Sequence, residues 1–252
     1  MKKIIGYALQ TLLVVTWLLC GHLHASDADY QQGLKALQTN DFSSALHYLE
    51  LAVAGDPDNL RYGNQYRQVI VHQKEFDRGV KFFEQLVAQH PQAPNLHLNC
   101  GFAYVDKIPV AGSITQVMLA NNALTEFSKA LQLQPGWITY YTRGISYLFW
   151  PKIFNRASLG VADLEAAMKI QQSERHHGYH LKAYLALGDG YWKTDNLAKA
   201  RITWAEGLKE FPKSALLQKR LALHGDELKE LIELQFDPSI RVNTDLRDLW
   251  ED

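Results

Sequence analysis

A pattern of small, apolar and turn residues recurs at a spacing of 34 residues, and it constrains the fold more than any other feature of the sequence. Residues 26–59 carry two apolar stripes at helical spacing, joined by the polar turn Thr39-Asn40-Asp41. Because turn residues separate two helical periodicities, this stretch predicts a helix hairpin. Shifted by 34 residues, the frame pairs Ala36 with Ile70, Phe42 with Phe76, Ala45 with Gly79, Leu49 with Phe83, and Pro57 with Pro91.

The same frame is found three more times further along the chain. The third copy contains Gly101, Tyr104, Ala123, Phe127, Ala130 and Pro135. The fourth contains Gly144, Tyr147, Gly160, Leu164 and Ala167, and the fifth contains Tyr184, Gly188, Leu197, Ala200, Trp204, Gly207 and Pro212. The residue pattern and its period resemble those of the tetratricopeptide repeat (TPR), which is also 34 residues long.

This resemblance implies an all-α fold, a TPR-type α-solenoid of stacked antiparallel helix hairpins with C-terminal capping helices. The solenoid is expected over residues 26–224, followed by a capping helix and an acidic tail over 225–252. Proteins of this family usually bind other proteins, so we expect a non-catalytic scaffold for a protein or peptide, for example in assembly of an envelope or respiratory complex. The expected repeats lie near residues 26–59, 60–93, 94–136, 137–171 and 181–214.

The N-terminus has the pattern of an export signal. Met1-Lys2-Lys3 precedes an apolar run from Ile4 to Leu19, and Ala25 offers a small residue for cleavage. This order predicts a secretory signal peptide over residues 1–25 and a periplasmic mature chain. Two alternatives are an uncleaved membrane anchor and a lipoprotein attached at Cys20, although bulky Leu19 argues against lipidation. All three export residues 26–252.

Composition and motifs exclude several classes of function. The formal net charge of −1 gives no general attraction for nucleic acid or for an anionic membrane. After signal removal a single cysteine, Cys100, is left, so no intramolecular disulfide can form, and we expect this thiol to be buried. The sequence has no glycine-rich phosphate loop and no nucleophile elbow. We therefore expect neither an enzyme nor a cofactor.

Two insertions interrupt the repeat frame, both between the helices of a hairpin. Gly101 and Ala123 are 22 positions apart where Gly33 and Ala45 are 12 apart, so ten residues have been added, with Ser113 as the expected cap of a lengthened second helix. In the fourth copy Gly144 and Gly160 are 16 positions apart, so four residues have been added. Equivalent turns of stacked repeats are neighbours in space. Either the inserts pack on each other, or they form an exposed apolar edge for a partner or a membrane surface, with the candidates Ile108, Pro109, Val110, Trp150, Ile153 and Phe154.

The TPR resemblance also implies a partner-binding groove lined by the first helix of each repeat. The expected groove is polar toward the N-terminus and aromatic toward the middle, which suits an extended peptide or a partner helix. Tyr30 and Leu34 replace the polar residues with which some relatives clamp a terminal carboxylate, so that ligand is not expected. The groove candidates are Arg61, Asn64, Gln68, Phe102, Tyr141, Leu148 and Trp192.

Three clustered histidines give a weaker hypothesis from another class of function. His176, His177 and His180 could hold a metal and make the chain an accessory factor for a metal or redox enzyme. Gly178 weakens a helix there, and no acidic or cysteine ligand lies at a matching spacing. No metal site is therefore expected.

The C-terminal tail combines acidic and apolar residues. Residues 226–252 contain nine acidic residues against three basic ones, whereas the body of the mature chain is mildly basic. A disordered tail rarely carries so many apolar residues, so we expect this one to dock on the solenoid and occupy part of the groove. The alternative is a short motif that engages another protein. The apolar residues are Ile240, Val242, Leu246, Leu249 and Trp250.

Overall fold

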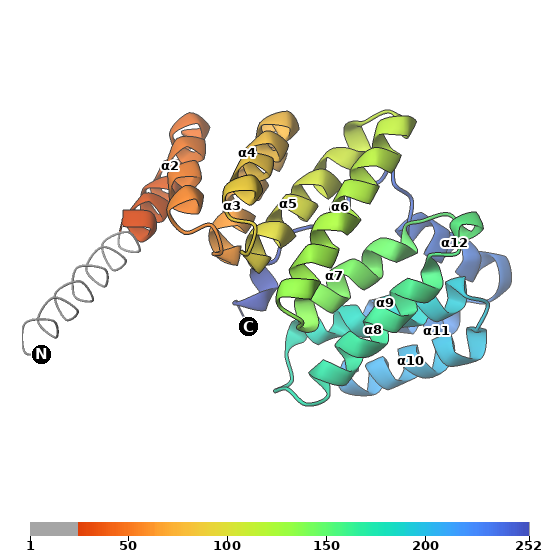
Figure 1. Cartoon of the computed structure of the whole chain (residues 1–252). Coiled ribbons are helices and arrows are strands. Elements are labelled where there is room, and N and C mark those ends of the chain that lie inside the picture. Colours follow the sequence, from red (N-terminus) through yellow and green to blue (C-terminus); the bar gives the residue numbers. More distant parts are fainter. Residues whose placement is uncertain (1–24, 252) are drawn as a thin grey trace, which may run out of the picture. The chain divides into compact units, whose positions relative to one another are not determined.

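The computed structural model describes residues 25–251, which form two compact units (Figure 1). Unit 1 ends at Asn99, and unit 2 begins at Cys100. Residues 25–251 contain helices, turns and irregular segments, and no strand. The predicted signal peptide, with the alternative anchor and the Cys20 lipid site, lies outside the described residues apart from Ala25.

Unit 1 consists of helix hairpins whose turns follow from local side-chain chemistry. Asn40 adopts the left-handed conformation (φ 57°) that a short turn requires, and the Asp41 carboxylate accepts from the backbone N–H of Ser44. Asn59 caps the next helix in the same way, by accepting from the Tyr62 N–H. The helices are residues 25–38, α2 (Phe42–Gly55), α3 (Leu60–Gln73), α4 (Phe76–Gln89) and the start of α5 (Pro94–Lys107), which contains the boundary between the units.

Small residues let the helices of unit 1 approach closely, as the repeat frame predicts. A Cβ added at Gly33 would lie 2.8 Å from Cγ of Leu49, and one at Gly79 would lie 2.9 Å from Cγ2 of Ile70. Leu49 and Phe83, which occupy equivalent positions of the first two copies, are fully buried. The 34-residue frame is therefore a packing pattern.

Unit 2 continues the series of helices. Its consecutive helices from α6 to α11 pack against one another. Its elements after α5 are η1 (Ile108–Val110), α6 (Ser113–Leu133), α7 (Trp137–Leu148), η2 (Lys152–Phe154), α8 (Ala157–Gln171), η3 (Gly178–His180), α9 (Leu181–Lys193), α10 (Leu197–Glu210), α11 (Ala215–Ala222), α12 (Gly225–Gln235) and η4 (Arg247–Leu249).

The core of unit 2 joins the repeat helices to the C-terminal ones. Leu164 and Trp204 are fully buried at repeat-frame positions. Helix α12 adds Leu228, Ile232 and Phe236 to the same cluster, so it covers apolar surface as a capping helix must. The helix begins at Gly225, with His224 in the cap position.

The first insertion lengthens a helix, as predicted. Helix α6 has 21 residues, whereas α4 has 14. The prediction of its cap was wrong: Ser113 is the first helical residue, and the cap residue Gly112 has no side chain to offer. Cys100 is buried, as expected. Among residues 25–251, no helix combines the length and the hydropathy that crossing a membrane requires.

Candidate partner-binding surfaces

The first insertion exposes aliphatic side chains along the beginning of α6. Ile114 is 82% exposed and Met118 is 61% exposed, one helical turn apart on the same face. Val110 is also exposed, while Ile108 and Pro109 are partly buried. The Gln116 side-chain amide donates to the Ile108 carbonyl (3.2 Å), which holds η1 against α6.

The second insertion divides its apolar residues between the core and the surface. Ile153 is 88% exposed, and Phe154 is 54% exposed. Trp150 is only 6% exposed, because the Arg156 guanidinium lies 3.6 Å above its ring and Phe154 packs edge-on against it (5.5 Å between ring centres). The prediction that Trp150 offers its surface to a partner was wrong, since its own insert covers it.

Arg156 also connects the two insertions. Its Nη1 donates to Oδ1 of Asn121 on α6 (3.2 Å), and the Asn121 amide donates to the Val117 carbonyl one turn earlier (3.0 Å). The expected proximity of the two inserts is therefore present in unit 2. Their exposed apolar residues, called the edge surface from here on, are Val110, Ile114, Val117, Met118, Ile153 and Phe154.

Lys152, which precedes Ile153 of the edge surface, is paired with an acidic side chain. The Lys152 ammonium contacts both carboxylate oxygens of Asp195 (2.6 and 2.7 Å), and both side chains are largely solvated. Such an exposed pair contributes little to stability, typically under about 1 kcal/mol. The edge surface is therefore apolar with a polar rim, the arrangement that protein interfaces use.

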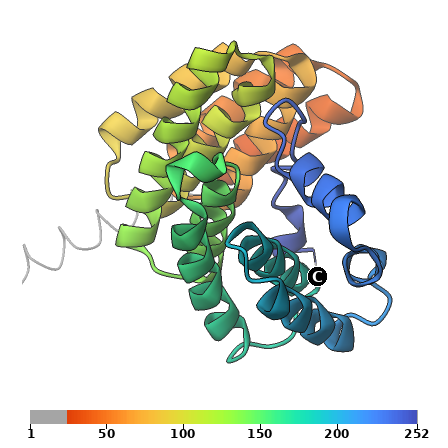
Figure 2. The same cartoon turned by 90° about the vertical axis from the view of Figure 1, so that its right-hand side faces the viewer.

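The C-terminal end of the chain covers a second candidate surface of unit 2, which includes residues of α5 and α9. Residues 239–251, the C-terminal segment, leave the end of α12 and run back as an irregular connection to the short turn η4 (Figure 2). The Thr244 hydroxyl donates to the Asp106 carboxylate of α5, and Asp248 pairs with Lys182 of α9. Leu249 packs against the core of unit 2. The tail docks on unit 2, as the sequence predicts.

Most of the predicted groove residues of unit 2 already pack against other side chains of this unit. Tyr141 stacks on Trp137 (4.8 Å between ring centres, 7° between planes), and burial, followed by the charges of Asp248 and Asp189, raises the pKa of Tyr141. Phe102 packs against Phe127. The prediction for Leu148 was wrong, because this side chain lies fully inside the core.

Trp192 is half-buried at a cavity of about 610 Å³. The cavity wall mixes apolar and charged side chains, with Lys193 above the Phe236 ring (4.7 Å). Burial lowers the pKa of Lys193, which Asp189 and Glu233 partly oppose. The cavity is lined by Pro151, Lys152, Trp192, Lys193, Asp195, Leu197, Lys229 and Glu233.

The predicted groove residues of unit 1 have different environments. Arg61 is exposed beside the Tyr30 ring (5.6 Å), and Gln68 is partly buried. Asn64 is fully buried and accepts from Nη2 of Arg67 (3.0 Å), so the prediction that it contacts a partner was wrong. Arg67 also donates through Nε to Oδ1 of Asn99 (3.2 Å). A buried guanidinium needs such partners, and Asn64 serves it.

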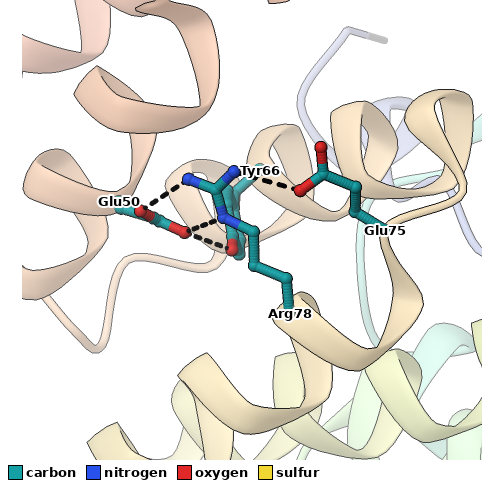
Figure 3. A network of polar contacts seen from close by, with 4 residues as sticks. All are labelled: Glu50, Tyr66, Glu75 and Arg78. Atoms are coloured by element: carbon teal, nitrogen blue, oxygen red, sulfur yellow. Dashed lines mark hydrogen bonds and ion pairs between the residues drawn. The ribbon is translucent and has the colours of Figure 1, made fainter. Parts of the chain in front are cut away.

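Sequence reasoning missed a polar network that joins three helices of unit 1. Figure 3 shows Arg78 between Glu50 and Glu75, with the Tyr66 hydroxyl donating to Glu50 (2.7 Å). Arg78 donates to both Glu50 oxygens (2.8 and 3.0 Å) and to Glu75 (3.0 Å). Hydrogen bonding to Glu50 raises the pKa of Arg78. The only sequence signal was the helical i,i+3 spacing of Glu75 and Arg78.

A buried ion pair in unit 2 was also missed. Asp189 of α9 accepts two hydrogen bonds from Arg220 of α11 (2.6 and 2.7 Å), and both side chains are almost completely buried. Burial raises the pKa of Asp189, while the hydrogen bonds and charge of Arg220 oppose that rise. Because 31 positions separate the two residues, no local spacing could predict the pair.

The histidine cluster packs against aromatic rings. His176 lies against Phe211 and His177 stacks on Tyr179, while Nε2 of buried His180 is 3.7 Å from Glu174. Burial, followed by the neighbouring His177, lowers the pKa of His180. Within residues 25–251, no group of three or more His, Cys, Asp or Glu side chains is placed to hold a metal ion.

Comparisons with known proteins identify the fold. The structure of TTC0263, a thermophilic TPR protein of Thermus thermophilus, matches with a TM-score of 0.55 and 18% identity over 79% of this chain and 97% of that one. A TPR protein of Parabacteroides merdae matches with a TM-score of 0.57 and 14% identity over 83% and 74% of the two chains. The MamA protein gives 0.52 and 15% over 80% and 98%.

These likenesses confirm the prediction of an all-α, TPR-type fold. No protein-family model matches the chain, and no curated protein sequence matches it either. At 14–18% identity the matches define the fold, and the binding properties must be argued from the surfaces of this chain.

Proposed function

We propose that this chain is an exported, non-catalytic TPR scaffold that captures a partner protein through the edge surface of unit 2. The observation that carries the proposal is the exposure of six apolar side chains, from 49% to 88%, on two inserts that Arg156 ties together. Clustered exposed apolar residues mark interaction sites in soluble proteins. The TPR fold agrees, because stacked hairpins offer a ready-made surface.

The edge surface suits an apolar face of a partner, such as one side of an amphipathic helix. Ile114 and Met118 stand one turn apart on α6, so a helix laid beside them can place its own apolar residues between them. Because α6 and the Arg156 contacts already order this surface, binding requires little rearrangement of the scaffold.

Site-directed photo-crosslinking in cells tests the edge surface. A photo-reactive amino acid replacing Met118, on the first insert, should form a discrete adduct with one partner. The double variant Ile153→Ser and Phe154→Ser, on the second insert, should remove that adduct. Ile153 is 88% exposed, so its replacement should change stability by less than about 0.5 kcal/mol, and circular dichroism checks that loss of the Phe154–Trp150 contact leaves the helices folded.

The matched control is the double variant Leu216→Ser and Leu234→Ser. These two leucines lie on α11 and α12 and are 54% and 57% exposed, close to the 54% of Phe154. They should leave the adduct intact. An adduct that survives the change on the second insert would show that the two inserts do not form one binding site.

Export is tested by the N-terminal sequence of the chain purified from the cell envelope. The proposal expects a mature chain that begins at Ser26, because Ala25 follows the basic end and the apolar run of a secretory signal. A chain that retains Met1 would replace the periplasmic scaffold with a membrane-anchored one, and a lipid on Cys20 would make it a lipoprotein.

A further inference from the structure

The C-terminal segment is held on unit 2 by specific polar contacts. Asp106, which is buried near the end of α5, accepts from the Thr244 hydroxyl through its carboxylate. The backbone carbonyl of Asp106 also accepts from Nη1 of Arg241 (2.9 Å). Asp106 therefore binds two side chains of the segment, Arg241 and Thr244, which are three positions apart.

The other end of the C-terminal segment is held by an ion pair and by apolar contacts. Lys182, at the start of α9, pairs with Asp248, and η4 lies against η3. Leu246 is buried, and Leu249 packs against the core of unit 2. The segment thus touches α5 and α9, and the charge of Asp248 adds to burial in raising the pKa of Tyr141 on α7.

The C-terminal segment resembles a bound peptide more than a structural element. Thr244 and Leu246 are buried at alternate positions and are flanked by exposed Asn243 and Arg247, while the Asp245 side chain between them keeps 13% of its surface exposed. Alternate burial is what an extended peptide shows when one face contacts a receptor. Helix α12, in contrast, buries Leu228, Ile232 and Phe236 along a regular helical face.

We propose that the surface formed by Asp106, Tyr141 and Lys182 is a peptide-binding groove and that the C-terminal segment is its resident, displaceable ligand. A partner binds there by presenting an extended segment of the same chemistry. That segment carries a hydroxyl residue, a leucine two positions later and a carboxylate two positions beyond that. This groove is separate from the edge surface, and neither proposal depends on the other.

The test uses the full chain with a protease recognition sequence inserted between Pro238 and Ser239, where the chain is exposed. Cutting leaves the C-terminal segment in place but free to dissociate. The probe is a fluorescent peptide of residues 239–252, whose binding is followed by anisotropy. The cut protein should bind the probe saturably, and the uncut protein should bind it at least about tenfold more weakly, because its own segment competes at high effective concentration.

Charge reversal locates the binding. Lys182→Glu in the cut protein should weaken the probe by about tenfold or more, and an Asp248→Lys peptide should recover binding to that variant. A Thr244→Val peptide should also bind weakly, because it leaves the buried Asp106 carboxylate without this donor. The control peptide Glu251→Gln changes an exposed residue and should bind like the original.

Several outcomes would overturn the proposal. Equal uptake of the probe by cut and uncut protein would place its binding elsewhere. Loss of helicity on cutting, or a segment that never exchanges with the probe, would make the segment a fixed part of the fold. Dimers of the uncut protein that exchange their segments would assign the groove to a second copy of this chain and not to a partner protein.

Discussion

Unit 1 and unit 2 contain the same kind of helix hairpin, yet they differ in what they expose. Leu51 is the one large apolar side chain of residues 25–99 with substantial exposure, at 43%. Unit 2 exposes many, and half of them belong to the two insertions. In unit 1, where no insertion interrupts the 34-residue frame, nearly all large apolar side chains go to the interior. The residues of the repeat frame therefore pack the helices together, and the two insertions provide exposed apolar surface that a partner can contact.

The ion pairs of Arg78 in unit 1 and Arg220 in unit 2 differ in burial. Arg78 of unit 1 is 39% exposed in its side chain and shares carboxylates that water can also reach, whereas Arg220 of unit 2 is enclosed with Asp189. A half-exposed network is screened and replaceable, while a buried pair becomes costly when one partner is removed. Unit 2 should therefore depend more strongly on its buried Asp189–Arg220 pair.

The largest effect is expected from breaking the buried pair. Arg220→Leu leaves the Asp189 carboxylate enclosed without its cation and should lower the free energy of unfolding by about 3–5 kcal/mol. Chemical denaturation followed by circular dichroism measures this loss. The double variant Asp189→Leu with Arg220→Leu should recover much of it, and a double variant as unstable as the single one would refute the ion-pair explanation.

A smaller and local effect is expected in the C-terminal segment. Leu246→Ala removes its most buried aliphatic anchor and should destabilise docking by about 2 kcal/mol. Proteolysis should then cut between residues 239 and 251 faster, while global unfolding changes little. Leu228→Ala, in the core face of α12, should instead lower global stability. Similar global losses in both variants would show that the segment unfolds together with the core.

The pH dependence of unit 2 should come partly from His180. Its pKa is lowered from 6.5 by burial, so the folded state favours the neutral ring. The associated stability is fully present above pH 6.5 and is lost as pH falls through the folded-state pKa. Protection factors of the α9 amides, which correct for the pH dependence of intrinsic exchange, should therefore fall on mild acidification, and His180→Asn should reduce that change. Parallel pH profiles for the two proteins would exclude His180 as the cause.

The smallest effect is expected in unit 1. Arg78→Leu should lower the free energy of unfolding by about 1 kcal/mol or less, because the network is partly solvated. The same denaturation measurement applies, with Arg220→Leu as the comparison. A loss for Arg78→Leu that equals the loss for Arg220→Leu would remove the distinction between the two units.

The sequence predicted what depends on periodicity. Gly33 and Gly79 predicted close contacts between helices, and the spacing from Gly101 to Ala123 predicted the longer α6. These predictions succeed because a helix converts sequence spacing directly into a face. The docking of the C-terminal segment was foreseen for a similar reason, since its apolar residues need cover.

Predictions failed where one side chain decides the environment of another. Trp150 is hidden because Arg156 lies across its ring, and Asn64 is buried because Arg67 needs an acceptor. Leu148 follows the core packing of α7 and not the family position that points into a groove. Apolar or polar character alone does not say which neighbour will cover a residue, so these orientations required three-dimensional information.

Arg156 couples the two inserts through a single guanidinium, which stacks on Trp150 and donates to Asn121. We therefore expect the residues that make these contacts to be constrained together. A replacement of Asn121 leaves Arg156 without its partner on α6, and a replacement of Arg156 uncovers an indole. In descendants of this chain, positions 121, 150 and 156 should change together or not at all.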